Sequence, residues 1–188
     1  MDLSTRVKRI LLQPSAEWAV IEAERGTPAD LYKSYIIPLA AIGPVASIIG
    51  LSIIGVGLPM GGSYRVSLLG ASARAVTSFV VALAGTYVLA LIINALAPTF
   101  RGAQNEFQAL KVAAYSSTAA WVVGIVNLSP PLAFLQILAL YSVYLLYLGL
   151  PVLMKSPREK ALPYTGVVVI AAIVVFGVLA ALSSCFIP

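Results

Sequence analysis

Residues Val112–Met154 read VAAYSSTAAWVVGIVNLSPPLAFLQILALYSVYLLYLGLPVLM and include no charged side chain. A single helix of these 43 residues would be about 65 Å long, twice the hydrocarbon thickness of a bilayer. The run therefore has to turn back on itself. We predict the turn at Asn127-Leu128-Ser129-Pro130-Pro131, because the two prolines lack backbone donors and push the preceding residue out of helical geometry.

Three further uncharged runs, Ser34–Tyr64, Ala75–Phe100 and Ala161–Pro188, each suit one membrane crossing. A crossing needs about 20 apolar residues, and one charge at mid-bilayer costs about 2.5–3.5 kcal/mol. The sequence therefore predicts an all-α integral membrane protein, a bundle of five transmembrane helices, with residues 34–188 as the transmembrane domain. The approximate crossings are 37–58, 74–98, 110–127, 131–154 and 164–186.

The composition indicates the same class of protein. Charged residues make up 10% of the chain and apolar residues 60%, whereas soluble domains have about 25% and 45–50%. A soluble fold of this size could not bury so much apolar surface, while a bilayer solvates it.

The basic residues predict the orientation of the bundle. With a cytoplasmic N-terminus, ten of the twelve lysines and arginines lie on the cytoplasmic side, and only Arg65 and Arg74 lie on the other. Basic residues near helix ends accumulate on the cytoplasmic side. We therefore expect a cytoplasmic N-terminus, an extracytoplasmic C-terminus and an outer half nearly bare of polar groups.

Residues 1–33 are expected to form a cytoplasmic segment on the membrane surface. Leu3, Val7 and Ile10 recur at helical spacing among basic residues, which predicts a short amphipathic helix lying on the inner leaflet. A second short helix would place Trp18 at the interface. We favour an anchor for the first crossing, and a partner-binding surface is the alternative.

The first crossing has a recognisable start signal. Thr27-Pro28-Ala29-Asp30 resembles a capping box with proline at the first helical position. We expect a helix to begin there and Pro38 to bend it at its entry into the membrane.

Four stretches resemble the Yip-domain family of five-helix membrane proteins. They are RVKRILLQPSAEWAVIEAE (6–24), LYKSYIIPLAAIG (31–43), FQALKVAAYSST (107–118) and YSVYLLYLGLPVLMKSPREKA (141–161). The likeness is to the bacterial branch, which implies a multi-pass protein of a prokaryotic inner or plasma membrane. Many relatives have proline where this chain has Ala119. The small-GTPase role of eukaryotic members is not carried over, because residues 1–33 do not match their long cytoplasmic extension.

Polar side chains within the crossings are the first place to look for a site, because each needs a partner or water. Seven of them could line an inward-opening pocket: six lie in the cytoplasmic half, and Tyr141 lies near the middle of the membrane. They are Asn94, Tyr115, Ser116, Ser117, Tyr141, Tyr144 and Tyr147. The alternative is packing, since small residues let membrane helices approach closely and tyrosines commonly lie at interfaces.

A second polar cluster, Asn105, Glu106 and Lys111, lies at the start of the third crossing. A carboxylate there favours the helix N-terminus electrostatically. We interpret this cluster chiefly as a cap.

The types of residue present argue against a catalytic site or a metal site. The chain has no histidine and one cysteine, Cys185, and no crossing contains a carboxylate. We therefore expect no catalytic, cofactor or metal site and no enzyme. The leading hypothesis is a non-enzymatic membrane-organising or scaffold protein. The alternative is a small oligomeric transporter or channel for an uncharged or anionic solute.

The two hypotheses differ in the packing that they require. A water-filled cavity in the cytoplasmic half would favour transport, and a solid bundle would favour a scaffold. The expected partners are membrane lipid and either a second copy of the chain or another membrane protein, and no nucleic acid.

Overall fold

The computed structural model describes residues 2–57 and 63–186. Within these ranges, five helical stretches are long and apolar enough to cross a membrane. They are Pro28–Ile54, Leu68–Phe100, Glu106–Leu128, Pro131–Leu153 and Arg158–Gly177. The prediction of an all-α integral membrane protein with five transmembrane helices is confirmed.

The spans are assembled from shorter elements. In chain order these are α1 (Leu3–Leu12), α2 (Pro14–Ala23), α3 (Pro28–Leu31), α4 (Ile37–Ala40), α5 (Ile42–Ile48), β1 (Val56–Gly57), β2 (Ser63–Tyr64), α6 (Leu68–Leu96), α7 (Glu106–Ser116), α8 (Thr118–Val123), α9 (Tyr141–Leu153) and α10 (Arg158–Phe186). Segments of 3-10 helix occupy Ala97–Phe100, Gly124–Leu128 and Pro130–Leu140. The two strands pair antiparallel over two residues each. The chain reverses at Ser129, inside the turn predicted from the prolines.

The first span departs from regular α-helix twice, over Tyr32–Ile36 and over Ile49–Ile54, and the first departure directly precedes the predicted bend at Pro38. Thr27 and Asp30 form the expected capping box, in which the Asp30 amide donates to the Thr27 hydroxyl over 3.2 Å. One turn later the chain widens into π-helix over Tyr32–Ile36, and the Ile37 amide donates to the Tyr32 carbonyl five residues back. Pro38 follows and has no amide to donate, so the regular ladder cannot continue through it.

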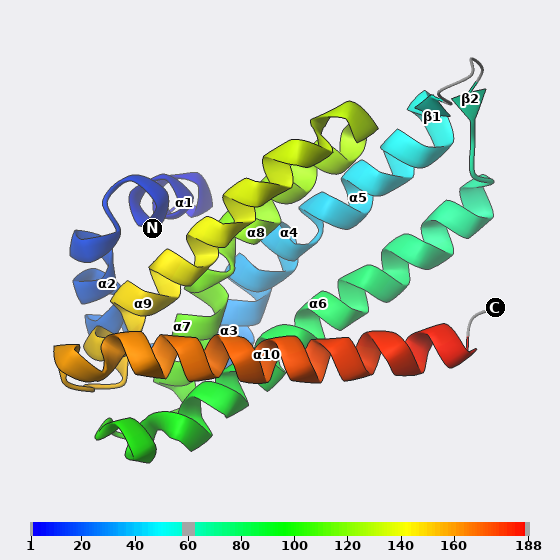
Figure 1. Ribbon diagram of the computed structural model, residues 1–188. Helices are drawn as coiled ribbons and strands as arrows, with labels where there is room; N and C mark the ends of the chain where they lie inside the picture. Colours follow the sequence, from blue (N-terminus) through cyan, green and yellow to red (C-terminus); the bar gives the residue numbers. More distant parts are fainter. Residues whose placement is uncertain (1, 58–62, 187–188) are drawn as a thin grey trace.

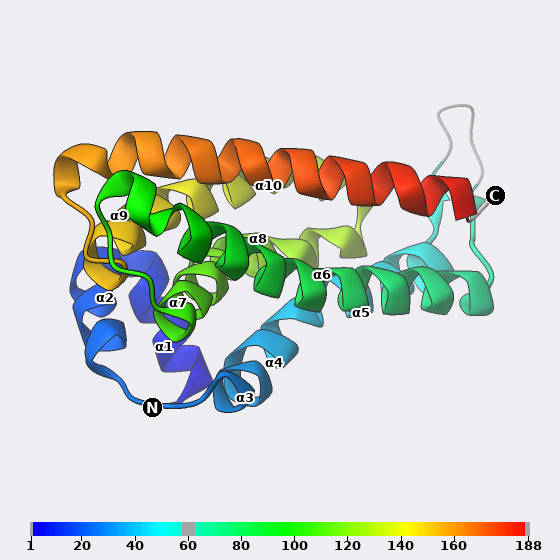
Figure 2. The same ribbon diagram turned by 90° about the horizontal axis from the view of Figure 1, so that it is seen from below.

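Helix α7 lies at the centre of the bundle. It packs against α6 and α9, while α10 lies across α6 and α9 (Figures 1 and 2). All eight residues from Ala109 to Ser116 are buried. Around them the core includes Ile93 of α6, Leu145 and Leu150 of α9, and Tyr164 of α10. The third span is therefore shielded by its neighbours, whereas fewer than a third of the residues in each of the other four spans are buried.

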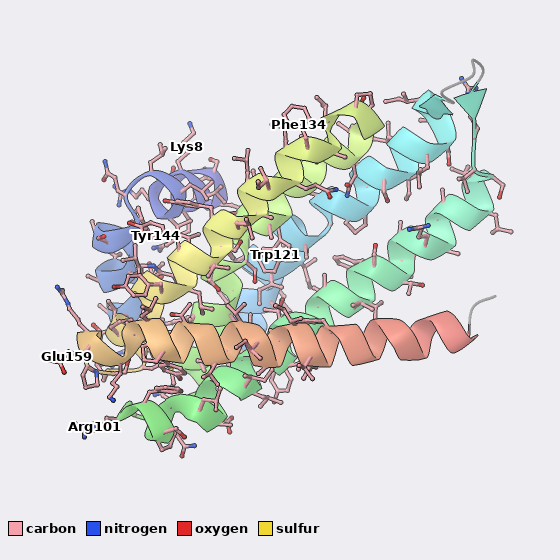
Figure 3. The ribbon with its side chains drawn as sticks, in the orientation of Figure 1. Lys8, Arg101, Trp121, Phe134, Tyr144 and Glu159 are labelled. Carbon is pink, nitrogen blue, oxygen red and sulfur yellow. The ribbon has the colours of Figure 1, made fainter. Side chains whose placement is uncertain are left out.

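The two ends of the bundle differ in character. Helices α1 and α2 and the loops that follow the second and fourth spans lie at one end, and the β1–β2 pair lies at the other (Figure 1). Lys8, Arg101 and Glu159 all lie at the α1–α2 end (Figure 3). We call this the charged end and the opposite one the hairpin end. The two loops of the charged end are joined where the Ala103 amide donates to the Met154 carbonyl over 2.7 Å.

The N-terminal helices are part of the fold, which corrects the prediction that they lie on the lipid surface. Helix α2 packs on α9, and α1 on α2 and α8. Trp18, expected at the membrane interface, has no exposed surface, and Arg6 of α1 is only 5% exposed. The amphipathic pattern of α1 is real, but its apolar face covers protein instead of lipid: Ile10 is wholly buried in the common core.

Gly149 makes the docking of α2 possible. A Cβ atom at this position would lie 2.7 Å from Cζ2 of the Trp18 indole, so the helices can approach this closely only without a side chain there. Small residues serve the same purpose between membrane helices.

We predict that Gly149→Val displaces α2. Overpacking of a filled core lowers the free energy of unfolding by about 1–3 kcal/mol. At this position the added side chain would collide with the Trp18 indole. The midpoint of thermal unfolding in detergent should fall, and the Trp18 emission should shift to the red. Gly166 is the matched control, because a Cβ added there meets nothing within 4 Å. Equal effects of Gly149→Val and Gly166→Val would contradict the prediction.

Candidate functional site

The most unusual feature of the charged end is a buried ion cluster. The Arg6 guanidinium donates from Nη1 to Glu17 Oε1 and from Nη2 to Glu24 Oε1. Glu17 is 3% exposed, so a full ion pair lies inside the protein. Burial by itself lowers the pKa of Arg6, but the hydrogen bond that Arg6 donates to Glu24 and the charges of both carboxylates outweigh burial and raise the pKa. The guanidinium therefore stays charged and binds α1 to α2.

Lys111 of α7 adds a second cation beneath the same helices. Its ammonium donates to the carbonyls of Ile21 and Glu24 over 2.8 and 2.6 Å. These carbonyls belong to the C-terminal turn of α2 and the residue beyond its end, where carbonyls have no partner within the helix. A cation there also interacts favourably with the helix dipole. The third span thus caps α2.

Three aromatic rings continue this cluster into the bundle. The Tyr115 ring lies 4.4 Å from that of Tyr35 and 6.2 Å, edge-on, from that of Trp18. The Tyr35 hydroxyl and Thr118 Oγ1 share a hydrogen bond of 2.7 Å. Arg6 lies 5.8 Å from the centre of the Tyr115 ring.

A cavity of about 370 Å³ lies beside these groups and is called here the charged-end pocket. It is lined by Leu3, Arg6, Glu24, Arg25, Ser34, Tyr35 and Tyr115. Of the seven candidate residues, only Tyr115 reaches it.

The other six candidates lie elsewhere. Ser116 and Ser117 donate to the Ala113 carbonyl of their own helix, over 3.2 and 2.8 Å. They line an apolar pocket with Ser142 and residues of α9 and α10. The Asn94 carbonyl accepts a 3.3 Å bond from Gln104, and its side-chain Oδ1 is buried with no hydrogen-bond partner among the described residues.

The tyrosines of α9 point in different directions. The Tyr141 hydroxyl donates to the Leu11 carbonyl over 2.9 Å and thereby holds the end of α1. Tyr144 lies beside it, with ring centres 5.4 Å apart, but is 47% exposed. Tyr147 is 37% exposed, in a shallow pocket with Ser15 and Arg158. The seven candidates are thus spread over separate places.

The second predicted cluster is also divided. The Asn105 side chain accepts from the Gln108 amide over 3.0 Å and is the N-cap of α7. Glu106 lies exposed in the first turn of that helix, where a carboxylate was expected to be favourable. Lys111 is turned away from both, onto α2. The sequence did not predict the ion cluster of Arg6, Glu17 and Glu24. Its ion pairs join residues that are 11 and 18 positions apart, and such pairs leave no local pattern in the sequence.

A larger cavity, about 520 Å³, lies at the hairpin end and is called here the hairpin-end pocket. Its polar lining is Ser47, Arg74, Ser78, Asn127 and Gln136. The expectation that this half is nearly bare of polar groups is therefore wrong. The signal was weak because these residues come from four separate helical segments, and only Arg74 and Ser78 show a helical spacing.

The charged and thiol side chains do not gather into a metal site in the described part of the chain. No three His, Cys, Asp or Glu residues there are placed so that they could hold an ion.

Comparison with known proteins agrees with this architecture. The family model described as "Yip1 domain" matches residues 8–179. The inner membrane protein YohC of Escherichia coli, in each of two strains, is 29% identical over 174 residues, which cover 90% of this chain and 89% of the relative. No solved structure matches the chain. Since the family model begins within α1 and spans α2 and all five membrane spans, this chain belongs to the Yip1 domain family.

Proposed function

We propose that the chain is a non-enzymatic membrane-organising protein that uses its charged end as a docking platform. The proposal is supported by the way the polar groups of that end are used. Tyr35, Tyr141 and Lys111 bond to Thr118 and to backbone carbonyls of α1 and α2. Helices α1 and α2 pack on α8 and α9, with Trp18 between them and the bundle.

The platform itself consists of the exposed side chains of α1 and α2. Lys8 and Arg9 face outward next to Leu12, which is 77% exposed. A rigid surface with charged and apolar side chains suits a second membrane protein or another copy of this chain. The docked N-terminal helices and this platform together support an organising role.

A photo-crosslinking amino acid at Lys8 tests the proposal in native membranes. We expect discrete protein adducts that disappear when Arg6→Leu releases α1. The control position is Leu69 of α6, which is 84% exposed at the hairpin end and should give no such adducts. Adducts with lipid alone from position 8, or the same adducts from both positions, would count against a docking platform.

The proposed location is a bacterial inner membrane with the charged end in the cytoplasm. The similarity to YohC, an inner membrane protein, and the ten-to-two distribution of basic residues support it.

Labelling of engineered cysteines tests this orientation. In a Cys185→Ser background, an impermeant maleimide should label Arg65→Cys in intact cells. It should label Ser4→Cys only after the membrane is permeabilised. The reverse pattern would invert the topology.

A small oligomeric transporter for an uncharged or anionic solute is the second candidate, favoured by the hairpin-end pocket and its arginine. Proteoliposome flux that is lost in Arg74→Gln would support it. Flux unchanged by Tyr115→Phe, Asn94→Ala and Arg74→Gln would argue against every polar group discussed above as part of a pathway.

A further inference from the structure

The hairpin-end pocket brings together polar groups from four helical segments. Helix α6 presents Arg74, Ser78 and Ala82 at four-residue spacing, which places them on one face. The segment after α8 contributes Asn127, whose Oδ1 accepts a 3.2 Å bond from Gln136. The cavity of about 520 Å³ is in the range of small-molecule sites, about 300–1,000 Å³.

The lining changes from polar to apolar with depth. Helix α6 runs inward from the hairpin end, so Ala82 lies about 12 Å deeper than Arg74 at a rise of about 1.5 Å per residue. The chain through α8 runs the other way, so Trp121 lies deeper than Asn127. Trp121 is found near the middle of the bundle, between the charged end and the hairpin end (Figure 3). Arg74 and the side-chain amides of Asn127 and Gln136 thus form a polar rim of the pocket. Ala82 and Trp121 form its apolar floor.

No carboxylate among the described residues forms an ion pair with Arg74. All seven acidic side chains lie in residues 2–30, at Glu106 or at Glu159, which belong to the charged end. No carboxylate is among the described residues that line the pocket. An arginine within a membrane span is costly unless it reaches water or an anion, and its planar guanidinium suits a phosphate group.

We propose that the hairpin-end pocket binds one anionic phospholipid of the adjacent leaflet. The phosphodiester would bind Arg74, Asn127 and Gln136 at the rim, and the start of an acyl chain would lie on Ala82 and Trp121. A lipid of that leaflet has its head group at the rim depth and its chains toward the floor, so its own orientation matches the order of polar and apolar lining. Arg74 is the one cation among the described residues that line the pocket, which suits a singly charged anion. The inference does not rest on the membrane-organising role.

Quenching of Trp121 fluorescence tests the site. In a Trp18→Phe background Trp121 is the sole tryptophan, because the chain has two. The protein is placed in phosphatidylcholine vesicles that contain a rising fraction of phosphatidylglycerol brominated on its chains, and in parallel brominated phosphatidylcholine. We expect half-maximal quenching at about a tenfold lower fraction of the anionic lipid, the size of effect that a charge-assisted hydrogen bond supports.

Three variants and one soluble anion distinguish the outcomes. Arg74→Gln should abolish the preference for the anionic lipid, while Arg65→Gln, which removes the same charge beside the pocket, should keep it. Ala82→Phe should reduce quenching by filling the floor, and it tests the site independently if Arg74→Gln does not fold. Millimolar inorganic phosphate should not displace the lipid.

Equal quenching by the two lipids, or a preference that survives Arg74→Gln, would overturn the proposal. A loss of the anionic-lipid preference in Arg65→Gln as large as that in Arg74→Gln would also overturn it. Displacement by inorganic phosphate would assign the rim to a free anion and would equally refute a lipid site.

Discussion

Arg6→Leu is expected to lower the free energy of unfolding by about 3–5 kcal/mol, the cost of removing one partner from a buried ion pair. Glu17 is 3% exposed and would be left charged without its main partner, because Arg9 approaches it only to 3.9 Å and from the surface. The loss should appear as a lower thermal midpoint in detergent. It should also appear as cleavage by trypsin after Lys8 and Arg9, as α1 leaves the bundle.

Two variants make this prediction specific to the ion pair. Lys8→Leu removes an equal charge from the exposed face of the same helix and should change stability by less than about 0.5 kcal/mol. Arg6→Met combined with Glu17→Met replaces the pair with apolar side chains, which in buried pairs is often neutral, so it should recover much of the loss. An Arg6→Leu variant as stable as Lys8→Leu would show that the ion cluster contributes nothing.

Trp18→Ala is expected to lower the free energy of unfolding by about 3–5 kcal/mol, which is typical when an aromatic side chain is removed from a core. The indole is wholly buried between Gly149 and the Tyr115 ring, and neither neighbour can move to fill the space without displacing α7 or α9. The measurement is the thermal midpoint together with the accessibility of a cysteine at Ala19, on the exposed side of α2.

Trp18→Phe is the matched variant. The indole Nε1 is buried with no hydrogen-bond partner among the described residues, so the phenyl ring removes an unsatisfied donor while it keeps most of the apolar contact. Its cost should be a small fraction of that of Trp18→Ala. Equal losses in the two variants would mean that the polar edge of the indole matters more than its volume.

The topology of the protein was predictable because it depends on one-dimensional properties of the chain. Charge-free runs mark the spans, since charges in lipid are costly. The two prolines at residues 130 and 131 mark the reversal between the third and fourth spans. The capping box at Thr27 and Asp30 is equally local, and the structure forms it as expected.

The N-terminal helices were placed wrongly because their partners are distant in sequence. An amphipathic helix beside a membrane looks the same whether its apolar face covers lipid or protein. The deciding contacts are those of Arg6 with Glu24, of Trp18 with Gly149 and of Lys111 with the end of α2. None of them shows in the local pattern of the chain.

The predicted polar layer did not form for a geometric reason. Residues three apart on an α-helix differ in direction by about 60°, so Tyr141 and Tyr147 differ by about 120°. Tyr141 consequently reaches Leu11 while Tyr147 faces outward. The hairpin-end pocket was missed for the opposite reason, because single polar residues from several segments meet only in the folded bundle.

The docking of the N-terminal helices onto the bundle is tested most directly by the contact between Trp18 and lipid. In a Trp121→Phe variant, Trp18 is the sole tryptophan. Because its side chain has no exposed surface, phospholipids brominated near their head groups should quench its emission weakly. A helix lying on the inner leaflet would instead present this indole to the interface, so strong quenching by those lipids would contradict the docked arrangement.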